Sequence, residues 1–196
     1  MEFENKTIGF AFTGSFCTFS KTIEALEDLS KTEAKIIPIM SPVAYTTDTR
    51  FGNAKDINAK IEEICSHKIL STIKDTEPIG PKKLLDLLIV APCTGNTLAK
   101  LAIGIADTSV TMAVKAHLRN QRPVLLAVST NDALANAAKN IGNLMNYKNI
   151  YFVPARQDDC FFKPTSIVAD MKYIIPAAKA ALDSIQLQPI ILDGKI

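Results

Sequence analysis

An apolar segment that runs directly into small polar residues constrains the fold of this chain more than any other feature. Leu84 to Ala91 is apolar except at Asp86, which is typical of a strand buried on both faces of a parallel sheet. Pro92 has no N–H to donate and should end the ladder, and apolar residues recur at helical spacing after the run Cys93–Thr97. The pattern predicts a strand, a loop and a helix N-terminus. Such a joint can bind an anion or a polar cofactor, or it can be an ordinary connection that binds nothing.

Apolar strands alternate with amphipathic helices along the whole chain. Strands are predicted at residues 7–13, 34–41, 84–91, 123–129 and 149–154, and helices at residues 20–31, 54–66, 98–102, 110–118, 132–145 and 163–178. At the end of the helix at 110–118, we expect Lys115, His117 and Arg119 to face solvent or another subunit. The alternation predicts one domain, residues 1–196, with a three-layer, Rossmann-like (flavodoxin-like) α/β fold and a mostly parallel central sheet.

Small polar residues follow several of these strands. The carboxyl ends of parallel strands meet at one edge of a sheet, so we expect five segments to cluster there: Gly14, Ser41, Cys93–Thr97, Ser129–Asp132 and Arg156–Asp159. The Gly-x-Gly-x-x-Gly fingerprint of dinucleotide sites is missing. A site at this edge would consist of small polar side chains and backbone N–H groups, while a tight strand-to-helix turn is the alternative at Gly14.

A few charged residues are candidates for chemistry. Arg50, in a loop, can bind a carboxylate or phosphate through its forked guanidinium, and a solvated loop arginine is the alternative. Asp158 and Asp159 together with Lys163 could orient a substrate or move a proton, although a solvated loop with local salt bridges is the commoner role of such a set. His67 either complements a helix C-terminus or takes part in catalysis. The candidates for a general base are Asp132, Asp158 and His67.

Composition excludes several classes of protein. The chain has 196 residues, 47% of them hydrophobic, and a formal net charge of +2, which gives no electrostatic footprint for nucleic acid or a membrane surface. No apolar run reaches the ~20 residues of a membrane span, and the acidic N-terminus is not a secretory signal. Four scattered cysteines and two histidines predict neither a disulfide framework nor a metal centre. We therefore expect a cytoplasmic protein without a metal.

Short motifs in a matching order resemble the homo-oligomeric flavin-containing cysteine decarboxylase superfamily. The runs Ala91–Thr97, Ala99–Ala102 and Gly104–Asp107 are similar to the region of that superfamily known as PASANT. Within it, the chain is similar to the dipicolinate synthase B-subunit branch from about Lys6 to about Pro189, through the motifs Thr13-Gly14-Ser15, Thr49-Arg50-Phe51-Gly52, Pro78-Ile79-Gly80-Pro81, Ser129-Thr130-Asn131-Asp132-Ala133-Leu134 and Gln157-Asp158-Asp159. The resemblance implies a Rossmann-like flavoprotein that forms trimer-based homo-oligomers.

The resemblance also implies a cofactor site and a substrate site. The implied contacts to FMN come from residues at the strand ends: Gly14, Ser15, Ser41, Cys93, Thr94, Asn96, Ser129 and Thr130. For a small dicarboxylate substrate, the candidates are Arg50, Asn131 and Lys163.

The function implied by the resemblance is that of a dipicolinate synthase B subunit. With a separate A subunit, which is expected to bind NADP, the chain would convert dihydrodipicolinate to dipicolinate in the mother cell during sporulation. Two alternatives stay open, namely an FMN-dependent decarboxylase of a cysteinyl substrate and a non-catalytic flavoprotein-like scaffold for the A subunit. Where the decarboxylases carry Pro-Ala-Met-Asn, this chain has Val128-Ser129-Thr130-Asn131, and this polar run favours a ring dicarboxylate over a cysteinyl substrate.

Overall fold

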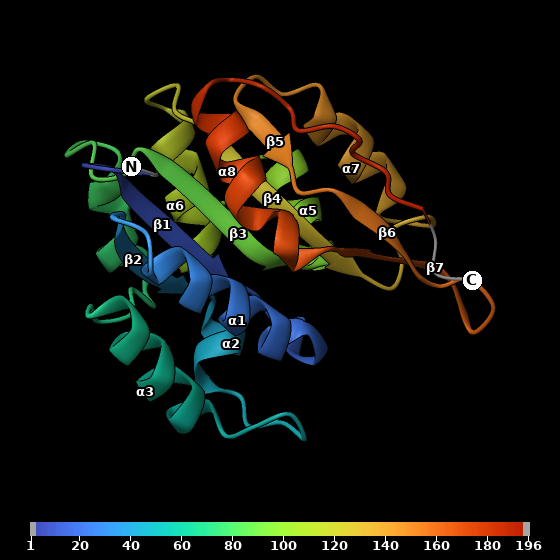
Figure 1. The fold of residues 1–196 in the computed structure, drawn as a ribbon, viewed down its shortest axis with the longest axis horizontal. Coiled ribbons are helices and arrows are strands. Elements are labelled where there is room, and N and C mark those ends of the chain that lie inside the picture. The colour runs from blue at the N-terminus through green and yellow to red at the C-terminus, as the bar shows by residue number, and fades with distance from the viewer. Residues whose placement is uncertain (1–2, 194–196) are drawn as a thin grey trace.

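A computed structural model describes residues 3–193 of the chain, which form a central sheet covered by helices (Figure 1). Within these residues the sheet has seven strands in the order β2-β1-β3-β4-β7-β6, and β5 pairs with β4 beside this path. The first five strands run parallel, whereas β6 and β7 form an antiparallel hairpin that we call the β6–β7 ribbon. The strands are β1 (Thr7–Phe12), β2 (Lys35–Met40), β3 (Leu87–Cys93), β4 (Val124–Thr130), β5 (Ile150–Phe152), β6 (Ala155–Asp159) and β7 (Lys163–Ala169).

Helices cover both faces of the sheet. One layer holds α1 (Phe19–Ser30), α3 (Ala54–Cys65) and α8 (Ile174–Leu182), and the other holds α5 (Gly95–Ala102), α6 (Ser109–Leu118) and α7 (Ala138–Met145). The connections contain two short helices, α2 (Pro42–Thr46) and α4 (Ile73–Thr76), and the 3-10 turns η1 (Phe16–Thr18), η2 (Glu77–Ile79) and η3 (Met171–Tyr173). The predicted three-layer fold with a mostly parallel sheet is confirmed.

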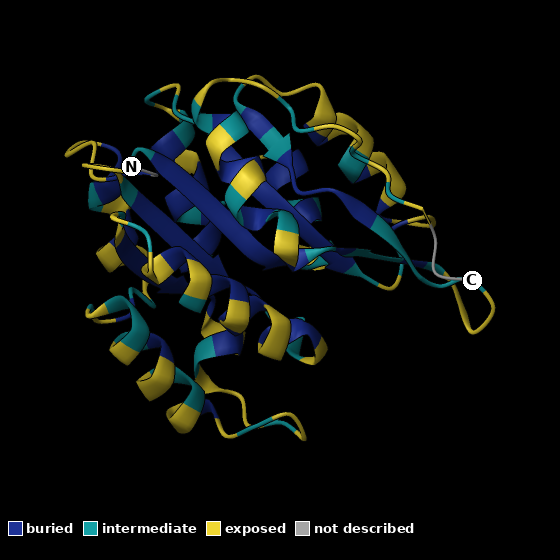
Figure 2. Ribbon diagram, in the orientation of Figure 1, coloured by how far each residue is buried: buried dark blue, intermediate teal, exposed yellow. Residues whose placement is uncertain are grey.

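Alternate side chains of each central strand enter different cores. On β1, Phe10 and Phe12 face the core beneath α1 and α8, whereas Ala11 faces the core beneath α5 and α6. Figure 2 shows the buried sheet between helices whose outer faces are exposed. Burial on both faces explains why these strands are nearly continuous apolar runs in the sequence.

Two elements differ in their bounds from the prediction. Strand β3 begins at Leu87 and continues through Pro92 to Cys93, although Pro92 was expected to end the ladder. The register between β3 and β4 shifts between Val90 and Cys93, and proline is tolerated at such an irregularity. After β4, turns occupy residues 131–137, so α7 begins only at Ala138.

The helix predicted at residues 163–178 is wrong in its first half. Lys163–Ala169 forms β7, which pairs antiparallel with β6 and with the end of β4. The segment contains Pro164 and the β-branched Thr165, Ile167 and Val168, which fit a pleated strand better than a helix. Arg156–Asp159, predicted as a loop, is likewise part of β6, and helical structure resumes only with η3 and α8.

The expectation that His117 faces solvent or another subunit is wrong. Its side chain is fully buried, and its Nε2 lies 3.0 Å from the carbonyl oxygen of Pro123. Because α4 and η2 pack against α6, the last turn of this helix has an inner side as well as an outer one. Lys115 and Arg119 lie on the outer side and are exposed.

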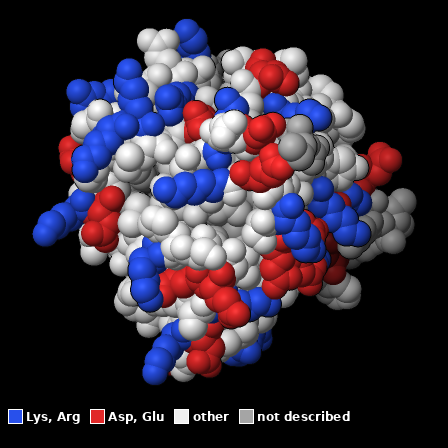
Figure 3. All heavy atoms as spheres, turned by 60° about the vertical axis from the view of Figure 1, so that its left-hand side comes forward, with Lys and Arg blue, Asp and Glu red and all other residues white. Residues whose placement is uncertain are grey.

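Charges of both signs are interspersed over the face drawn in Figure 3, in keeping with the net charge of +2. Among residues 3–193, no helix combines the length and apolar character needed to cross a membrane. The chain beyond α8 returns along β6, where the N–H of Ala155 donates to the carbonyl oxygen of Ile190 at 2.9 Å.

Candidate functional site

A hollow of about 800 Å³ lies where the parallel strands end. The loops after β1, β3 and β4, the β6–β7 ribbon and the loop before α3 all contribute side chains to it. We call it the strand-end hollow and define it by its lining residues, which are Gly14, Ser15, Phe16, Cys17, Arg50, Phe51, Thr94, Gly95, Asn96, Ser129, Thr130, Asn131, Asp132, Asp158, Lys163, Ser166 and Val168. The strand-end loops converge here because parallel strands place their carboxyl ends at the same edge.

Hydroxyl groups fasten the strand ends to one another beneath the hollow. The buried hydroxyl of Thr13 donates to the carbonyl oxygen of Pro92 at 2.6 Å and accepts the backbone N–H of Thr94 at 3.0 Å. Beside it, the hydroxyl oxygens of Ser15 and Ser129 lie 3.0 Å apart. The ends of β1, β3 and β4 therefore form one hydrogen-bonded floor.

Helix α5 begins in this floor. Thr94 is its N-cap, and its Oγ1 accepts the N–H of Thr97 at 3.3 Å. The next residue, Gly95, packs against two side chains at the end of β4. A Cβ at Gly95 would lie 2.7 Å from the Oγ1 of Thr130 and 2.8 Å from the Oδ1 of Asp132, so this close approach requires glycine.

Cationic side chains reach the hollow from two sides. Lys163 on β7 pairs with Asp158 on β6 at 2.7 Å, and this carboxylate raises the pKa of Lys163. The guanidinium of Arg50 lies 4.8 Å from the ring centre of Phe51 and forms no ion pair within residues 3–193. Both groups can neutralise an anionic ligand, and Arg50 can do so without breaking an ion pair first.

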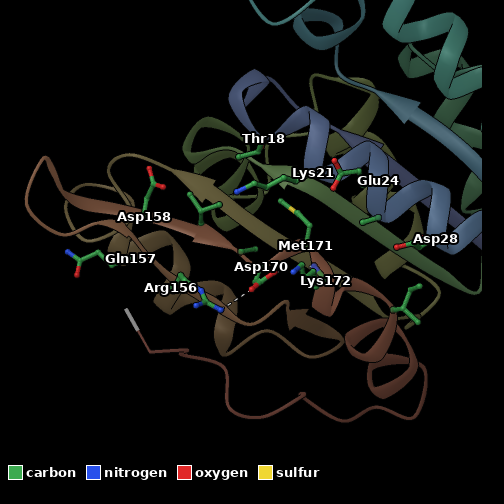
Figure 4. Close-up of a pocket in the computed structure, with 14 residues that line it drawn as sticks. Thr18, Lys21, Glu24, Asp28, Arg156, Gln157, Asp158, Asp170, Met171 and Lys172 are labelled. Atoms are coloured by element: carbon green, nitrogen blue, oxygen red, sulfur yellow. Dashed lines mark hydrogen bonds and ion pairs between the residues drawn. The ribbon is translucent and has the colours of Figure 1, made fainter. Parts of the chain in front are cut away.

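A second hollow of about 600 Å³ lies on the other side of the β6–β7 ribbon, against α1 (Figure 4). Lys21 and Asp28 of α1 line one side of it, and the ion pair between Arg156 and Asp170, 2.8 Å long, lines another. Asp158 lines both hollows, as does Val168 of β7. The ribbon is therefore the wall that separates them.

Most of the residues predicted for the site from the sequence line the strand-end hollow. These are Gly14, Ser15, Arg50, Thr94, Asn96, Ser129, Thr130, Asn131, Asp132, Asp158 and Lys163. Their positions agree with a shared site, while their individual roles in binding and catalysis stay predictions.

Three predicted residues lie outside the lining of the hollow. The hydroxyl of Ser41 accepts the N–H of Ala44 at 3.4 Å and so caps α2. Cys93 is fully buried in the core beneath α5 and α6, and burial raises the pKa of its thiol. His67 follows α3, and its Nδ1 lies 2.8 Å from the carbonyl oxygen of Lys68. Each of these side chains therefore has a local structural role.

Sequence reasoning missed several lining residues. Ser166 and Val168 were missed because their segment was predicted as a helix, although its β-branched residues pointed to a strand. Gly95 was part of the predicted loop, but nothing in the sequence showed which side chains it would approach. The full set of missed residues is Phe16, Cys17, Phe51, Gly95, Ser166 and Val168.

The chemistry of the hollow suits an organic ligand that has polar and anionic parts. Hydroxyl groups and the start of α5 offer hydrogen bonds, the rings of Phe16 and Phe51 offer apolar contact, and Arg50 with Lys163 offers positive charge. Across residues 3–193, no group of three or more His, Cys, Asp or Glu side chains could hold a metal ion.

The chain matches a family of known proteins over most of its length. The flavoprotein family model matches residues 1–183. Among curated proteins, the dipicolinate synthase B subunit of Bacillus subtilis (strain 168) is 42% identical over 191 residues, which cover 97% of this chain and 96% of that protein.

Solved structures are similar at two levels. The crystal structure of the dipicolinate synthase B subunit from Bacillus halodurans superposes with a TM-score of 0.91 at 40% identity, covering all of both chains. The FMN-dependent cysteine decarboxylase TvaF from thioviridamide biosynthesis superposes with a TM-score of 0.57 at 25% identity, covering 72% of this chain and 85% of that one.

Proposed function

We propose, since this chain belongs to the flavoprotein family, that it acts as the B subunit of a dipicolinate synthase and binds its ligands in the strand-end hollow. The observation that carries this proposal is the 42% identity to a dipicolinate synthase B subunit over 97% of the chain. In this proposal, the chain works with an A subunit that binds NADP, and together they oxidise dihydrodipicolinate to dipicolinate during sporulation.

The strand-end hollow fits FMN in size and in chemistry. Its volume of about 800 Å³ lies within the range of roughly 300–1,000 Å³ that is usual for cofactor sites. Hydroxyl groups and backbone N–H groups suit the ribityl phosphate, and the rings of Phe16 and Phe51 suit the flavin ring. The residues that would hold FMN are Gly14, Ser15, Thr94, Asn96, Ser129 and Thr130. When bound, FMN supplies a group that can accept or pass on a hydride.

A small dicarboxylate fits the cationic sides of the same hollow. Arg50 can bind one carboxylate through two parallel N–H groups, and Lys163 can exchange the carboxylate of Asp158 for one on the substrate. Asn131, which also lines the hollow, offers an amide. Two negative charges on the substrate would thus meet two positive charges on the protein.

The oxidation removes one hydride and one proton from the dihydropyridine ring. In our proposal the hydride reaches NADP⁺ on the A subunit, and a carboxylate of this chain takes the proton. Asp132 and Asp158 both line the hollow and can serve as that base. His67 is not among the residues that line the hollow, so we leave His67 out of the mechanism.

We also infer that the chain forms a homo-oligomer, trimer-based as its family resemblance implies. Two phenylalanines at the tip of the β6–β7 ribbon are largely exposed, Phe161 to 77% and Phe162 to 88%. Exposed neighbouring aromatic side chains favour contact with another protein surface. Light scattering after gel filtration tests this, and a monomeric mass at micromolar concentration would contradict it.

A second candidate function is FMN-dependent decarboxylation of a cysteinyl substrate. It is favoured by Asn96 and Asn131, because both amides line the strand-end hollow. A third is a non-catalytic scaffold for the A subunit, which needs neither flavin nor substrate in the hollow.

One series of measurements separates these functions. The absorbance spectrum of the purified chain, with and without added FMN, shows whether a flavin binds. Dipicolinate formation from dihydrodipicolinate and NADP⁺ is then measured for the A subunit alone and with this chain. Our proposal requires the rate to rise when the chain is added. Release of carbon dioxide from a cysteinyl peptide would favour the decarboxylase instead, and no flavin binding with no rate increase would overturn the proposal.

A further inference from the structure

The side chains of Thr130 and Asp132 form a short hydrogen bond in the wall of the strand-end hollow. The hydroxyl of Thr130 donates to the Oδ1 of Asp132 at 2.6 Å. Both side chains are partly exposed to the hollow, and both stand against Gly95 at the first turn of α5. The contact with Gly95 leaves the pair little room to move toward the helix.

This bond fixes the hydrogen-bonding character of the wall. A threonine hydroxyl has one proton and two lone pairs, and an ionised carboxylate only accepts. Because the hydroxyl proton of Thr130 is engaged in the hydrogen bond to Asp132, the hydroxyl oxygen of Thr130 and the carboxylate oxygens of Asp132 present only lone pairs to a ligand. A ligand atom that meets them must therefore be a donor.

The carboxylate also determines where negative charge can lie. A helix N-terminus attracts anions, but at α5 the carboxylate of Asp132 already stands against the first residue. An anionic group of the ligand would be repelled on this side and attracted by Arg50 and Lys163. The wall formed by Thr130 and Asp132 thus suits an uncharged N–H group.

We propose that Thr130, positioned by Asp132, accepts a hydrogen bond from a ring N–H of the ligand and thereby selects a nitrogen heterocycle. This inference rests on the proposed function, because it concerns the same hollow. The N–H has two possible sources, namely the imide of the flavin and the ring nitrogen of a dicarboxylate. Thr130 is the residue that touches the ligand and Asp132 is a positioning residue, which leaves Asp158 as the base of the proposed oxidation.

Two pairs of probes distinguish the sources. FMN is compared with 3-methyl-FMN, in which a methyl group replaces the imide proton. A 4-oxo-1,4-dihydropyridine-2,6-dicarboxylate, which has a ring N–H, is compared with the 4-oxopyran-2,6-dicarboxylate, which has a ring oxygen of similar size in its place. Dissociation constants are measured by calorimetry for the full chain, alone and with the A subunit.

We expect the N–H member of one pair to bind about tenfold more tightly, the usual effect of one hydrogen bond to a strong acceptor. Thr130→Val should abolish this preference and Thr130→Ser should restore it. Asp132→Asn should reduce this preference, because a neutral amide oxygen accepts a weaker hydrogen bond from the Thr130 hydroxyl than a carboxylate does. Ser166→Ala is the matched control, since it removes another hydroxyl that lines the hollow and should leave the ratio unchanged. Circular dichroism checks that each variant is folded.

The possible outcomes test this inference separately from the proposed function. If FMN and the dicarboxylates bind but neither pair shows a preference, or if Thr130→Val keeps the preference, the inference is overturned and the proposed function stands. If the wild-type chain binds neither FMN nor any dicarboxylate, both are overturned.

Discussion

The hydroxyl oxygens of Ser15 and Ser129 lie 3.0 Å apart, although 114 positions separate the two residues in the chain. Ser15 follows β1 and Ser129 lies near the end of β4, and these strands are separated in the sheet by β3. The contact thus bridges across the end of β3. It holds together two of the loops that line the strand-end hollow.

We expect Ser15→Ala and Ser129→Ala each to lower the free energy of unfolding by about 1 kcal/mol, because each leaves a hydroxyl without its partner. The two losses should not add, since the second substitution removes a hydroxyl that has already lost its partner. Urea unfolding of both single variants and of the double variant measures this coupling. Ser20→Ala, on the exposed side of α1, is the control and should change stability little. Fully additive losses would show that the two hydroxyls do not interact.

A second prediction concerns stability and follows from the close approach of α5 to the end of β4. Gly95→Ala should lower the free energy of unfolding by roughly 1–3 kcal/mol, because the new Cβ overlaps Thr130 and Asp132. Gly142→Ala in α7 is a matched control. No atom lies within 4 Å of a Cβ at Gly142, so alanine there should stabilise the chain by about 0.5–1 kcal/mol through its helix propensity. Thermal unfolding of both variants compares them directly.

A second background tests the cause of the loss. In a chain that already carries Thr130→Ala and Asp132→Ala, the overlapping atoms are gone, so Gly95→Ala should cost much less. An equal cost in both backgrounds would refute steric overlap as its origin.

The fold could be predicted from the sequence where burial alone determines the pattern. Strands β1 to β4 are buried on both faces, and their apolar runs are therefore visible in the sequence. The β6–β7 ribbon could not be found in this way. Its apolar residues Ile167 and Val168 are only half-buried, and their spacing relative to Met171 and Ile174 imitates a helix. Pairing with β4, a long-range contact, determines the structure there.

The candidate site was predictable in its location more than in its contacts. The order of parallel strands places the loops after β1, β3 and β4 together, whatever their side chains. Which side chains then meet depends on distances that no pattern encodes, as for Gly95 with Asp132. His117 shows the same limit in the core. A histidine in the last turn of an amphipathic helix was expected outside, and only the packing of η2 and α4 against α6 buries it.

Arg50 gives a third prediction, which concerns the dicarboxylate. Arg50→Gln should weaken binding of pyridine-2,6-dicarboxylate roughly tenfold, because a charge-assisted hydrogen-bond pair is lost. The weakening should shrink at high salt, since Arg50 is exposed and its charge is screened. Lys55→Gln removes an equal charge from the exposed start of the nearby α3 and serves as the control. Calorimetric titration at two salt concentrations measures both variants, and equal weakening by both would assign the effect to net charge alone.

His117 gives a prediction for the pH dependence of stability. Its side chain is fully buried, and its Nδ1 has no hydrogen-bond partner among the described residues. Burial is the largest cause and lowers the pKa of His117 to about 4, although the hydrogen bond to Pro123 raises it. The nearby charge of Arg122 lowers this pKa further, and that of Asp86 raises it.

The direction of the effect follows from proton linkage. An unfolded histidine has a pKa of about 6.5, so between pH 4 and this value the unfolded chain binds more protons than the folded one. The free energy of unfolding must then rise with pH. The stabilising contribution of neutral His117 is complete above pH 6.5 and is lost as the pH falls toward 4, by on the order of 3 kcal/mol.

Urea unfolding between pH 4 and pH 8 tests this against His117→Gln. The glutamine variant cannot titrate there, while every other ionisable group, His67 included, is kept. The difference in free energy of unfolding between the two proteins should therefore change across pH 4 to 6.5 and be constant above it. A difference that does not vary with pH would mean that His117 becomes protonated in the folded chain as readily as in the unfolded one.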